Sequence, residues 1–209
     1  MKKILNKQFY RRNTLIVARE LLGKFIVRKI GNKKLVGKIV EVEAYHGPRD
    51  LASHASKGKT ARNAVMFGRA GYAYVYMIYG MYFCFNIVTG DHNYPAAVLI
   101  RAVELMAGSR ERRSAFSTKN KLVFYPVRLR WGNSLTNGPG KFCRAFEIDK
   151  SLNGADITKS KVLWLEGRGV KIKKVDIAAA KRIGVDYAKE YKDKLWRFYI
   201  KSNLISKLK

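Results

Sequence analysis

Acidic residues are scarce in this chain of 209 residues, which has 15 aspartates and glutamates against 43 lysines and arginines and a formal net charge of +28. Such an excess of positive charge favours a polyanionic partner, because each phosphate that a protein neutralises releases counterions. An anionic membrane surface is a weaker candidate, since no segment combines a wholly basic face with a wholly apolar one. A lysine-rich composition without any anionic ligand is the alternative that charge alone leaves open.

Cysteine, histidine and long apolar runs are equally scarce. The two cysteines, Cys84 and Cys143, predict free thiols in a cytoplasmic protein rather than a disulfide framework. The three histidines, His46, His54 and His92, lack the spacing of a metal site, so we expect no metal and no cofactor. No run of about 18 apolar residues is present that could span a membrane, and the first residues lack the apolar stretch of a signal peptide.

The most distinctive stretch is an aromatic segment. Two runs rich in aromatic and β-branched residues, 72–78 and 82–88, flank Tyr79, Gly80 and Met81, and this pattern predicts a β-hairpin. The turn places the large side chains of Tyr79 and Met81 at the tip, where little of a sheet can cover them. On so basic a protein, an exposed aromatic side chain at a hairpin tip suggests a wedge that enters a base stack. The alternative is that Tyr79 folds back into the core.

Other patterns predict short helices and strands around this hairpin. A helix is predicted over 13–23, where an asparagine cap and a closing glycine bound apolar residues at helical spacing. Strands are predicted over 24–30, 35–45, 95–104, 161–166 and 195–200. Segment 104–115 is expected to begin as a helix, and 119–132 to be a loop or a peripheral strand. Residues 118–131 contain no acid, so this segment is either an extra nucleic-acid contact or a solvated loop.

Strand 35–45 carries the best candidate for a catalytic carboxylate. Alternation puts Ile39, Glu41, Glu43 and Tyr45 on one face and an apolar set on the other. This pattern indicates that the carboxylates look into a groove, although acids on exposed strands are common. In a chain with so few acids, Glu43 beside an aromatic residue is the leading candidate for a general base.

Three cationic residues stand out for their surroundings. Arg101 interrupts the apolar run 95–104, and a charge in such a run is normally paired or functional, with a strand glutamate or Glu104 as the expected partner. Arg62 is a candidate phosphate contact. Lys141 is another, because it lies at a predicted helix start with an early proline, where free amides can hold a phosphate.

Taken together, these residues occur in an order that resembles the alkyladenine (3-methyladenine) DNA glycosylase family, from about residue 10 to about residue 200. The matching motifs are Val40-Glu-Val-Glu-Ala-Tyr45, His54, Thr60-x-Arg62-Asn63, Met66-Phe67, Tyr76-Met-Ile-Tyr-Gly-Met-Tyr-Phe-Cys-Phe-Asn86 and Leu99-Ile-Arg101-Ala102. Segment 137–147 also resembles the Gly-Pro-x-Lys segment of that family, and segment 177–184 resembles its basic Ala-x-Arg-Ile-Gly-Val segment.

The resemblance implies an enzyme that flips a damaged purine out of duplex DNA and hydrolyses its N-glycosidic bond, leaving an abasic site. Within that pattern, Glu43 matches the general base that activates water, and Arg101 matches the arginine beside it. Tyr45 matches the aromatic residue on one face of the flipped base, and His54 and Tyr76 match those on the other face.

Three further residues acquire roles from the resemblance. Tyr79 matches the residue that fills the gap left in the base stack, with Met81 beside it. Asn86 matches the side chain that would collide with the 2-amino group of guanine, so the pocket should accept alkylated purines and hypoxanthine but resist guanine. The residue types suit this chemistry, because an alkylated purine is cationic and attracted to electron-rich rings. A carboxylate also stabilises positive charge that develops at C1′.

We therefore expect a single α+β domain over residues 1–209, with a curved, mainly antiparallel β-sheet, a protruding β-hairpin and surrounding short helices. Residues 1–9 and 202–209 are expected to be frayed basic termini. The expected enzyme is a monomeric, monofunctional glycosylase acting on double-stranded DNA, with no membrane partner. Two alternatives stay open: a non-catalytic single-stranded nucleic-acid binder that stacks bases on a basic sheet, and a bifunctional glycosylase with a lysine nucleophile.

Overall fold

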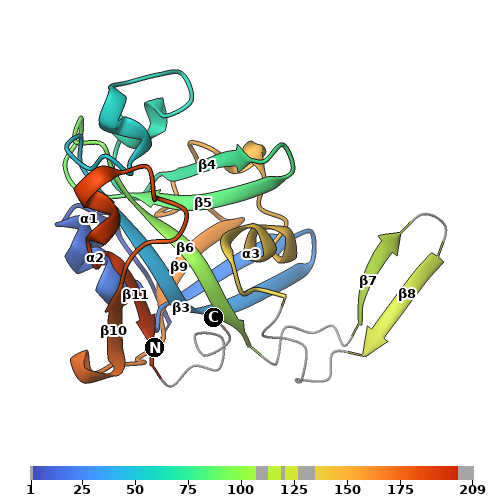
Figure 1. Ribbon diagram of the computed structural model, residues 1–209. Coiled ribbons are helices and arrows are strands. Elements are labelled where there is room, and N and C mark those ends of the chain that lie inside the picture. The colour runs from blue at the N-terminus through green and yellow to red at the C-terminus, as the bar shows by residue number, and fades with distance from the viewer. Residues whose placement is uncertain (1, 107–112, 119–120, 127–134, 202–209) are drawn as a thin grey trace.

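The computed structural model of the protein describes residues 2–106, 113–118, 121–126 and 135–201. Its centre is an antiparallel sheet in which the strands follow one another in the order β1-β9-β2-β3-β6-β5-β4, while β11 pairs with both β3 and β10 (Figure 1). These strands are β1 (Lys3–Ile4), β2 (Phe25–Ile30), β3 (Lys33–His46), β4 (Ala73–Ile78), β5 (Tyr82–Val88), β6 (Ala96–Leu105), β9 (Leu163–Gly167), β10 (Ile177–Ala180) and β11 (Arg197–Ile200). The predicted α+β architecture with a mainly antiparallel sheet is confirmed.

The long strand β3 positions the candidate carboxylates. It pairs with β6 along one side, from Gly37 to His46. On its other side it pairs first with β2, through residues 33–38, and then with β11, through residues 41–43. Glu41 and Glu43 therefore lie in the interior of the sheet, between β6 and β11.

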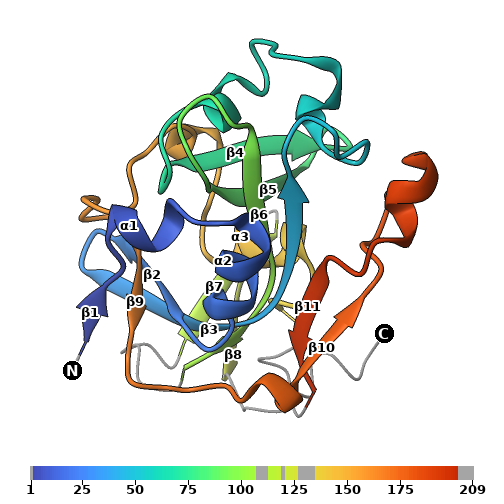
Figure 2. The same cartoon turned by 90° about the vertical axis from the view of Figure 1, so that its left-hand side faces the viewer.

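Short helices surround the sheet. They are α1 (Lys7–Tyr10), α2 (Thr14–Leu21), α3 (Pro139–Ala145) and the 3-10 helices η1 (His54–Lys57), η2 (Ala64–Phe67), η3 (Lys150–Leu152), η4 (Lys174–Asp176) and η5 (Lys189–Asp193). Figure 2 shows α2 in front of β3 and β6, with α3 behind them. Buried side chains from both helices join those of the strands in the main hydrophobic core. No helix in the described part of the chain is long and apolar enough to cross a membrane.

Local sequence signals account for the predicted helix over 13–23. The side chain of Asn13 accepts a hydrogen bond from the backbone N–H of Leu15 at 3.0 Å, which caps the first turn of α2. Gly23 follows the helix with a φ of 80°, a left-handed conformation that glycine adopts without steric cost. The prediction of this helix is confirmed.

Two predictions about the aromatic and basic segments can also be compared with the structure. The hairpin of β4 and β5 forms as expected, with Ile78 opposite Tyr82 at its end. Segment 119–132 contains the strand β8 (Lys121–Pro126), which pairs with β7 (Arg113–Thr118) in a separate two-stranded sheet. The remainder of that segment, residues 127–132 together with 119–120, lies outside the described residues.

The expected helix at the start of 104–115 is wrong. Glu104 and Leu105 are the last residues of β6, opposite Lys38 and Gly37 of β3. The Nζ atom of Lys38 is 2.5 Å from a carboxylate oxygen of Glu104. Pairing with β3 thus outweighs the helical preference of the local sequence, as tertiary contacts commonly do. Residues 107–112 lie outside the described residues.

The expected fraying of residues 1–9 is also wrong for residues 3–9. Lys3 and Ile4 form β1 on the edge of β9, and the N–H of Leu5 donates to the carbonyl of Leu165 at 2.9 Å. The side chain of Asn6 then caps α1. The free edge of β9 gives this terminus a hydrogen-bonding partner that composition alone does not reveal. Residues 202–209, also expected to fray, lie outside the described residues.

Candidate active site

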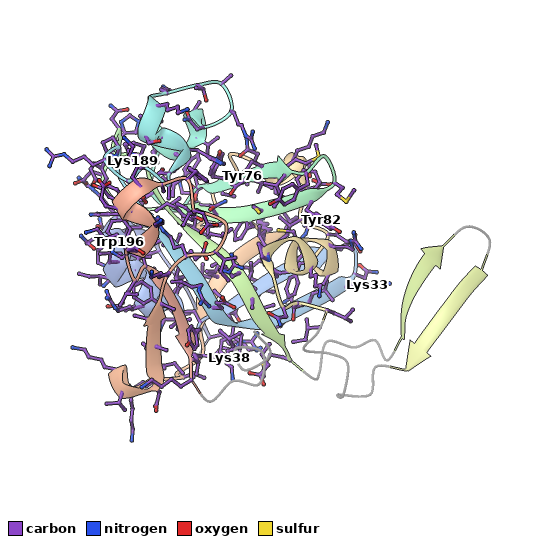
Figure 3. The ribbon with its side chains drawn as sticks, viewed as in Figure 1. Lys33, Lys38, Tyr76, Tyr82, Lys189 and Trp196 are labelled. Carbon is purple, nitrogen blue, oxygen red and sulfur yellow. The ribbon has the colours of Figure 1, made fainter. Side chains whose placement is uncertain are left out.

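A cavity of about 190 Å³ opens at the level of Glu43. Its lining comes from β3, the segment around η1 and η2, the β4–β5 hairpin, β6, the start of α3 and residues 183–187. The cavity is smaller than a typical pocket for a drug-sized ligand, about 300–1,000 Å³, and suits one small, flat group. Figure 3 labels Tyr76, which contributes to this lining from β4.

The carboxylate of Glu43 is the chemical centre of the cavity. The side chain is fully buried in the protein yet contributes to the cavity lining. Its Oε1 accepts a hydrogen bond from the backbone N–H of Ile183 at 2.9 Å and lies 3.2 Å from Nη1 of Arg101. Its Oε2 accepts from the hydroxyl of Tyr45 at 2.9 Å. An ionised carboxylate has about four acceptor sites, so these three donors leave room for about one more, such as water.

Tyr45 is held as a neutral donor to that carboxylate. Burial and, next, the negative charge of Glu43 raise the pKa of Tyr45 well above its usual value. The phenol therefore keeps its proton at physiological pH and can only donate to the glutamate.

A local irregularity of the β3–β6 ladder accompanies Arg101. Between Ile39 and Glu41 the register skips Val40 on β3. Between Glu41 and Val42 it skips Arg101 on β6. Such irregularities re-aim side chains and are common beside active sites.

Arg101 bridges both strand glutamates. Its Nε lies 3.2 Å from Oε1 of Glu41, and its Nη1 lies 3.2 Å from Oε1 of Glu43. Burial alone would lower the pKa of Arg101, but the charges of Glu43 and Glu41 outweigh it and raise that pKa. Arg197 of β11 also contacts Glu41, at 3.1 Å. The expected pairing of Arg101 with a strand glutamate is confirmed, whereas Glu104 pairs with Lys38 instead.

His54 and Tyr76 form an aromatic wall. Their ring centroids are 4.5 Å apart, and Tyr76 also packs against Tyr74 at 5.1 Å. Nδ1 of His54 lies 2.8 Å from the hydroxyl of Tyr74. Burial raises the pKa of Tyr74 to about 12, and burial followed by the positive charge of Arg62 lowers the pKa of His54. A hydrogen bond thus joins a neutral phenol and the imidazole, and it fixes the orientation of the His54 ring.

Asn86 lies on the buried side of the cavity. Its Nδ2 donates to the carbonyl of Tyr74 at 3.2 Å and lies 3.5 Å from that of Cys84. The thiol of Cys84 also lines the cavity, and burial raises its pKa to about 11, so it is a protonated, unreactive group. Both Cys84 and Cys143 are buried free cysteines, as the sequence predicted.

The hairpin tip carries exposed apolar side chains. Tyr79 is 85% exposed, Met81 64% and Met77 45%. Tyr79 also has a φ of 51°, which is uncommon for a residue other than glycine. Since Tyr79 lies at the rim of the cavity and does not pack into the core, the core-packing alternative is excluded for it.

The two candidate phosphate contacts lie outside the lining of the cavity. Arg62 is exposed, donates to the carbonyl of Met77 at 3.0 Å and lies over the ring of Tyr76. Lys141 is exposed on α3, two residues after Pro139, which does line the cavity. Arg62 thus contacts the cavity wall directly, whereas Lys141 is connected to the cavity only through the helix that begins at Pro139.

The structure thus brings six of the predicted residues to one cavity, with a seventh at its rim. They are Glu43, Tyr45, His54, Tyr76, Asn86, Arg101 and Tyr79. The described residues contain no group of three or more histidines, cysteines or acids that could hold a metal ion.

Sequence reasoning missed the segment that closes the cavity from the C-terminal side. Arg182 forms a fully buried ion pair with Asp50, and the following residues, Ile183 to Val185, line the cavity together with Tyr187. The available signal is the family resemblance of segment 177–184, which by itself assigns no role to any of its residues.

Comparison with known proteins agrees with this geometry. The model of the methylpurine-DNA glycosylase (MPG) family matches residues 8–204. A protein of Desulfitobacterium hafniense (strain Y51), named "Putative 3-methyladenine DNA glycosylase", is 46% identical over 208 residues, which covers 96% of this chain and 97% of that protein. Proteins of the same name from Methanocella arvoryzae and Clostridium novyi are 50% and 46% identical. The alignments cover 96% and 98% of this chain, and 94% and 99% of those proteins.

Proposed function

Since this chain belongs to the methylpurine-DNA glycosylase family and is a DNA glycosylase, we propose that it removes alkylated and deaminated purines from double-stranded DNA by hydrolysis. The substrates proposed are 3-methyladenine, 7-methylguanine and hypoxanthine. The observation that carries the proposal is the buried Glu43 carboxylate, which lines a base-sized cavity and has three fixed donors. The enzyme acts as a monomer.

In the proposed reaction, Glu43 acts as general base. Its free acceptor site takes a proton from a water molecule as the water oxygen bonds to C1′ of the flipped nucleotide. The N-glycosidic bond breaks and its electron pair leaves with the purine. A cationic alkylated base departs neutral, whereas hypoxanthine needs a proton or hydrogen bonds at its ring nitrogens. Arg101 holds Glu43 in place through the contact of its Nη1 atom with Oε1.

The aromatic side chains serve recognition. Tyr45 covers one face of the flipped base, and His54 and Tyr76 cover the other, which favours cationic purines over neutral ones. The low pKa of His54 supports this arrangement, because a protonated imidazole would repel a cationic base. Asn86, anchored on the carbonyl of Tyr74, excludes the 2-amino group of guanine.

The hairpin and the basic surface serve base flipping. Tyr79, with Met81 beside it, occupies the space that the extruded base leaves in the stack and so offsets part of the unstacking cost of a few kcal/mol. Arg62 and Lys141 contact phosphates beside the opening. These contacts hold the duplex in a fixed position while the nucleotide is extruded.

The two alternatives differ from this proposal in observable ways. A non-catalytic binder that stacks bases does not need a buried carboxylate beside an arginine. The match to a family of glycosylases also argues against this alternative. A lysine nucleophile would form a Schiff base with the sugar. Borohydride should therefore trap a covalent adduct between protein and DNA if a lysine attacks, and none if water does.

The deciding experiment is a single-turnover assay on a duplex with one hypoxanthine, in which abasic sites are read as strand breaks after alkali. Wild type should form abasic sites, and Glu43→Gln should be about 10²- to 10⁴-fold slower, which is the usual contribution of a general base. Glu166→Gln is the matched control, because Glu166 is also a buried glutamate paired with an arginine, Arg168, but lies on β9 outside the cavity lining.

Each other outcome has a defined meaning. Equal rates for wild type and Glu43→Gln would remove Glu43 from the mechanism. An inactive wild type calls for the same assay with 3-methyladenine and 7-methylguanine, and failure on all three lesions would refute the proposed substrates.

A further inference from the structure

The segment that closes the cavity from the C-terminal side is anchored by one buried ion pair. Nη1 of Arg182 lies 2.6 Å from Oδ2 of Asp50, and Nη2 lies 2.8 Å from Oδ1. Neither side chain is exposed. Nη1 also donates to the carbonyl of Ala44 at 2.9 Å, and Nη2 donates to that of Tyr191 at 3.2 Å. This one guanidinium therefore ties β3, the turn after it and the C-terminal segment together.

Asp50 in turn organises the chain that follows Tyr45. Its Oδ2 accepts from the backbone N–H of His46 at 3.0 Å, and its Oδ1 accepts from that of Ala52 at 3.1 Å. The carboxylate thus fixes the turn immediately beyond the cavity wall of β3. Both of its oxygens are shared between this turn and the guanidinium of Arg182.

Arg182 also packs between two aromatic rings. Its guanidinium carbon is 4.8 Å from the ring centroid of Tyr45 and 5.0 Å from that of Trp196, which Figure 3 labels. The planar guanidinium stacks against such rings more readily than an ammonium group. The Tyr45 ring, which lines the cavity, is therefore backed by a fixed cation.

The next residue along the chain contacts the proposed general base. The backbone N–H of Ile183 donates to Oε1 of Glu43 at 2.9 Å. Val185 packs against Ala52, and the hydroxyl of Tyr187 donates to the carbonyl of Ala52 at 3.2 Å. The position of the Ile183 N–H consequently depends on how firmly this segment is held on the turn.

We propose that Arg182 and Asp50 are positioning residues of the active site, whose ion pair holds the N–H of Ile183 on Glu43 and the ring of Tyr45 against the cavity. The inference rests on the proposed role of Glu43. Stability alone is a weak reason for such a pair, because well-packed apolar residues often replace a buried ion pair without loss of stability. The bidentate geometry instead fixes orientation, which catalytic groups need to within about 0.5 Å.

Arg182→Lys tests the proposal, since lysine keeps the charge and most of the stem but cannot contact both oxygens of Asp50 and two carbonyls from one plane. Single-turnover excision per folded molecule should fall by about 10²-fold, the effect of a displacement of about 1 Å. The acid limb of the pH–rate profile should move to higher pH, because a carboxylate that loses a donor is protonated more readily. Binding of abasic-product DNA should stay within about threefold of wild type, since the side chain of Arg182 is fully buried and cannot contact a phosphate.

Carboxyl NMR of protein with ¹³C-labelled glutamate gives a readout that needs no activity. The titration midpoint of Glu43, assigned with Glu43→Gln, should be higher in Arg182→Lys than in wild type. A wild type that is inactive on all three lesions would refute the proposed function, while this midpoint would still decide the positioning role. Asp50→Asn keeps one acceptor oxygen in the turn and should give the same shift if Arg182→Lys does not fold.

Arg168→Lys is the matched control. Arg168 pairs with the buried Glu166 at 2.7 Å and lies over the ring of Phe25, but contributes nothing to the cavity lining. It should change neither the rate per folded molecule nor the acid limb. An unchanged Glu43 midpoint or acid limb in Arg182→Lys, or a rate loss that disappears after correction for the folded fraction, would overturn the proposal.

Discussion

Tyr79 combines backbone strain with almost complete exposure. A φ of 51° in a residue other than glycine costs on the order of 1 kcal/mol, and a side chain that is 85% exposed gains little from packing. The turn is closed by a hydrogen bond from the N–H of Met81 to the carbonyl of Ile78 at 3.2 Å, which any side chain at position 79 would allow. Folding alone therefore gives no reason for a large aromatic residue at this position.

Replacement of Tyr79 with serine should separate function from stability. The free energy of unfolding should stay within about 0.5 kcal/mol of wild type, as for most surface substitutions. Single-turnover excision should slow, because nothing then fills the gap in the base stack. Urea unfolding and the hypoxanthine assay measure the two effects. Val175→Ser, which removes another apolar side chain that is 71% exposed, should leave both unchanged. A loss of several kcal/mol in Tyr79→Ser would instead mean that slower excision reflects lower stability of the fold.

His54 should make folding stability depend on pH. Burial and the charge of Arg62 lower its pKa below 6.5, so the unfolded chain binds the proton more readily than the folded protein does. The contribution of His54 to the free energy of unfolding is fully present above about pH 6.5. It is lost as the pH drops from there through the lowered pKa. His46, whose pKa is also lowered by burial, acts in the same direction. Urea unfolding at pH 7.5 and 5.5 should show a smaller difference in His54→Gln than in wild type, and equal differences would contradict this account.

At the scale of elements, the irregular pairing of β3 and β6 places one cation against two carboxylates. Arg101→Met should lower the free energy of unfolding by about 3–5 kcal/mol at pH 8, since removal of one partner leaves buried charge uncompensated. Denaturant unfolding of wild type and Arg101→Met at this pH measures the difference.

A surface ion pair provides the control for this prediction. Arg12→Met removes the partner of Glu20, and the two side chains are 37% and 48% exposed. Such pairs contribute only about 0–1 kcal/mol. If Arg101→Met proved as mild as Arg12→Met, the central ion pair would not stabilise the fold.

Elements with strong local signals could be predicted from sequence, and those that depend on distant partners could not. Asn13 and Gly23 bound α2 as their capping preferences indicate, and the turn at Tyr79 and Gly80 separates two strands as expected. In contrast, Glu104 continues a strand because β3 lies beside it, and β1 forms because the edge of β9 is free. Only the tertiary arrangement supplies those partners.

The same limit applies to the candidate site. Glu43 and Tyr45 are two residues apart on one strand, so alternation alone placed them together. Arg182 reaches Asp50 across 132 positions in the sequence, and no local pattern encodes such a contact. The skipped residues Val40 and Arg101 are equally invisible, because strict alternation assumes a regular ladder.

At the scale of the whole molecule, the net charge of +28 favours electrostatic attraction to DNA. Attraction to phosphates supplies most non-specific affinity, depends steeply on salt and does not depend on sequence. The cavity should contribute little to this salt-dependent attraction, because its central charges are paired with one another. Affinity for undamaged DNA and discrimination between bases should therefore reside in different parts of the molecule and respond differently to salt.

Salt titration of binding to undamaged duplex tests this division. The logarithm of the association constant should fall linearly with the logarithm of salt concentration, by about 0.9 per phosphate contacted. Arg62→Gln and Lys141→Gln should each reduce that slope by about one. Lys3→Gln is the control, because β1 and the β4–β5 hairpin lie at opposite ends of the strand order. Equal slopes for all three variants would mean that DNA does not lie across the hairpin side of the protein. A reduced slope in Lys3→Gln alone would move the DNA-binding surface to the β1 edge.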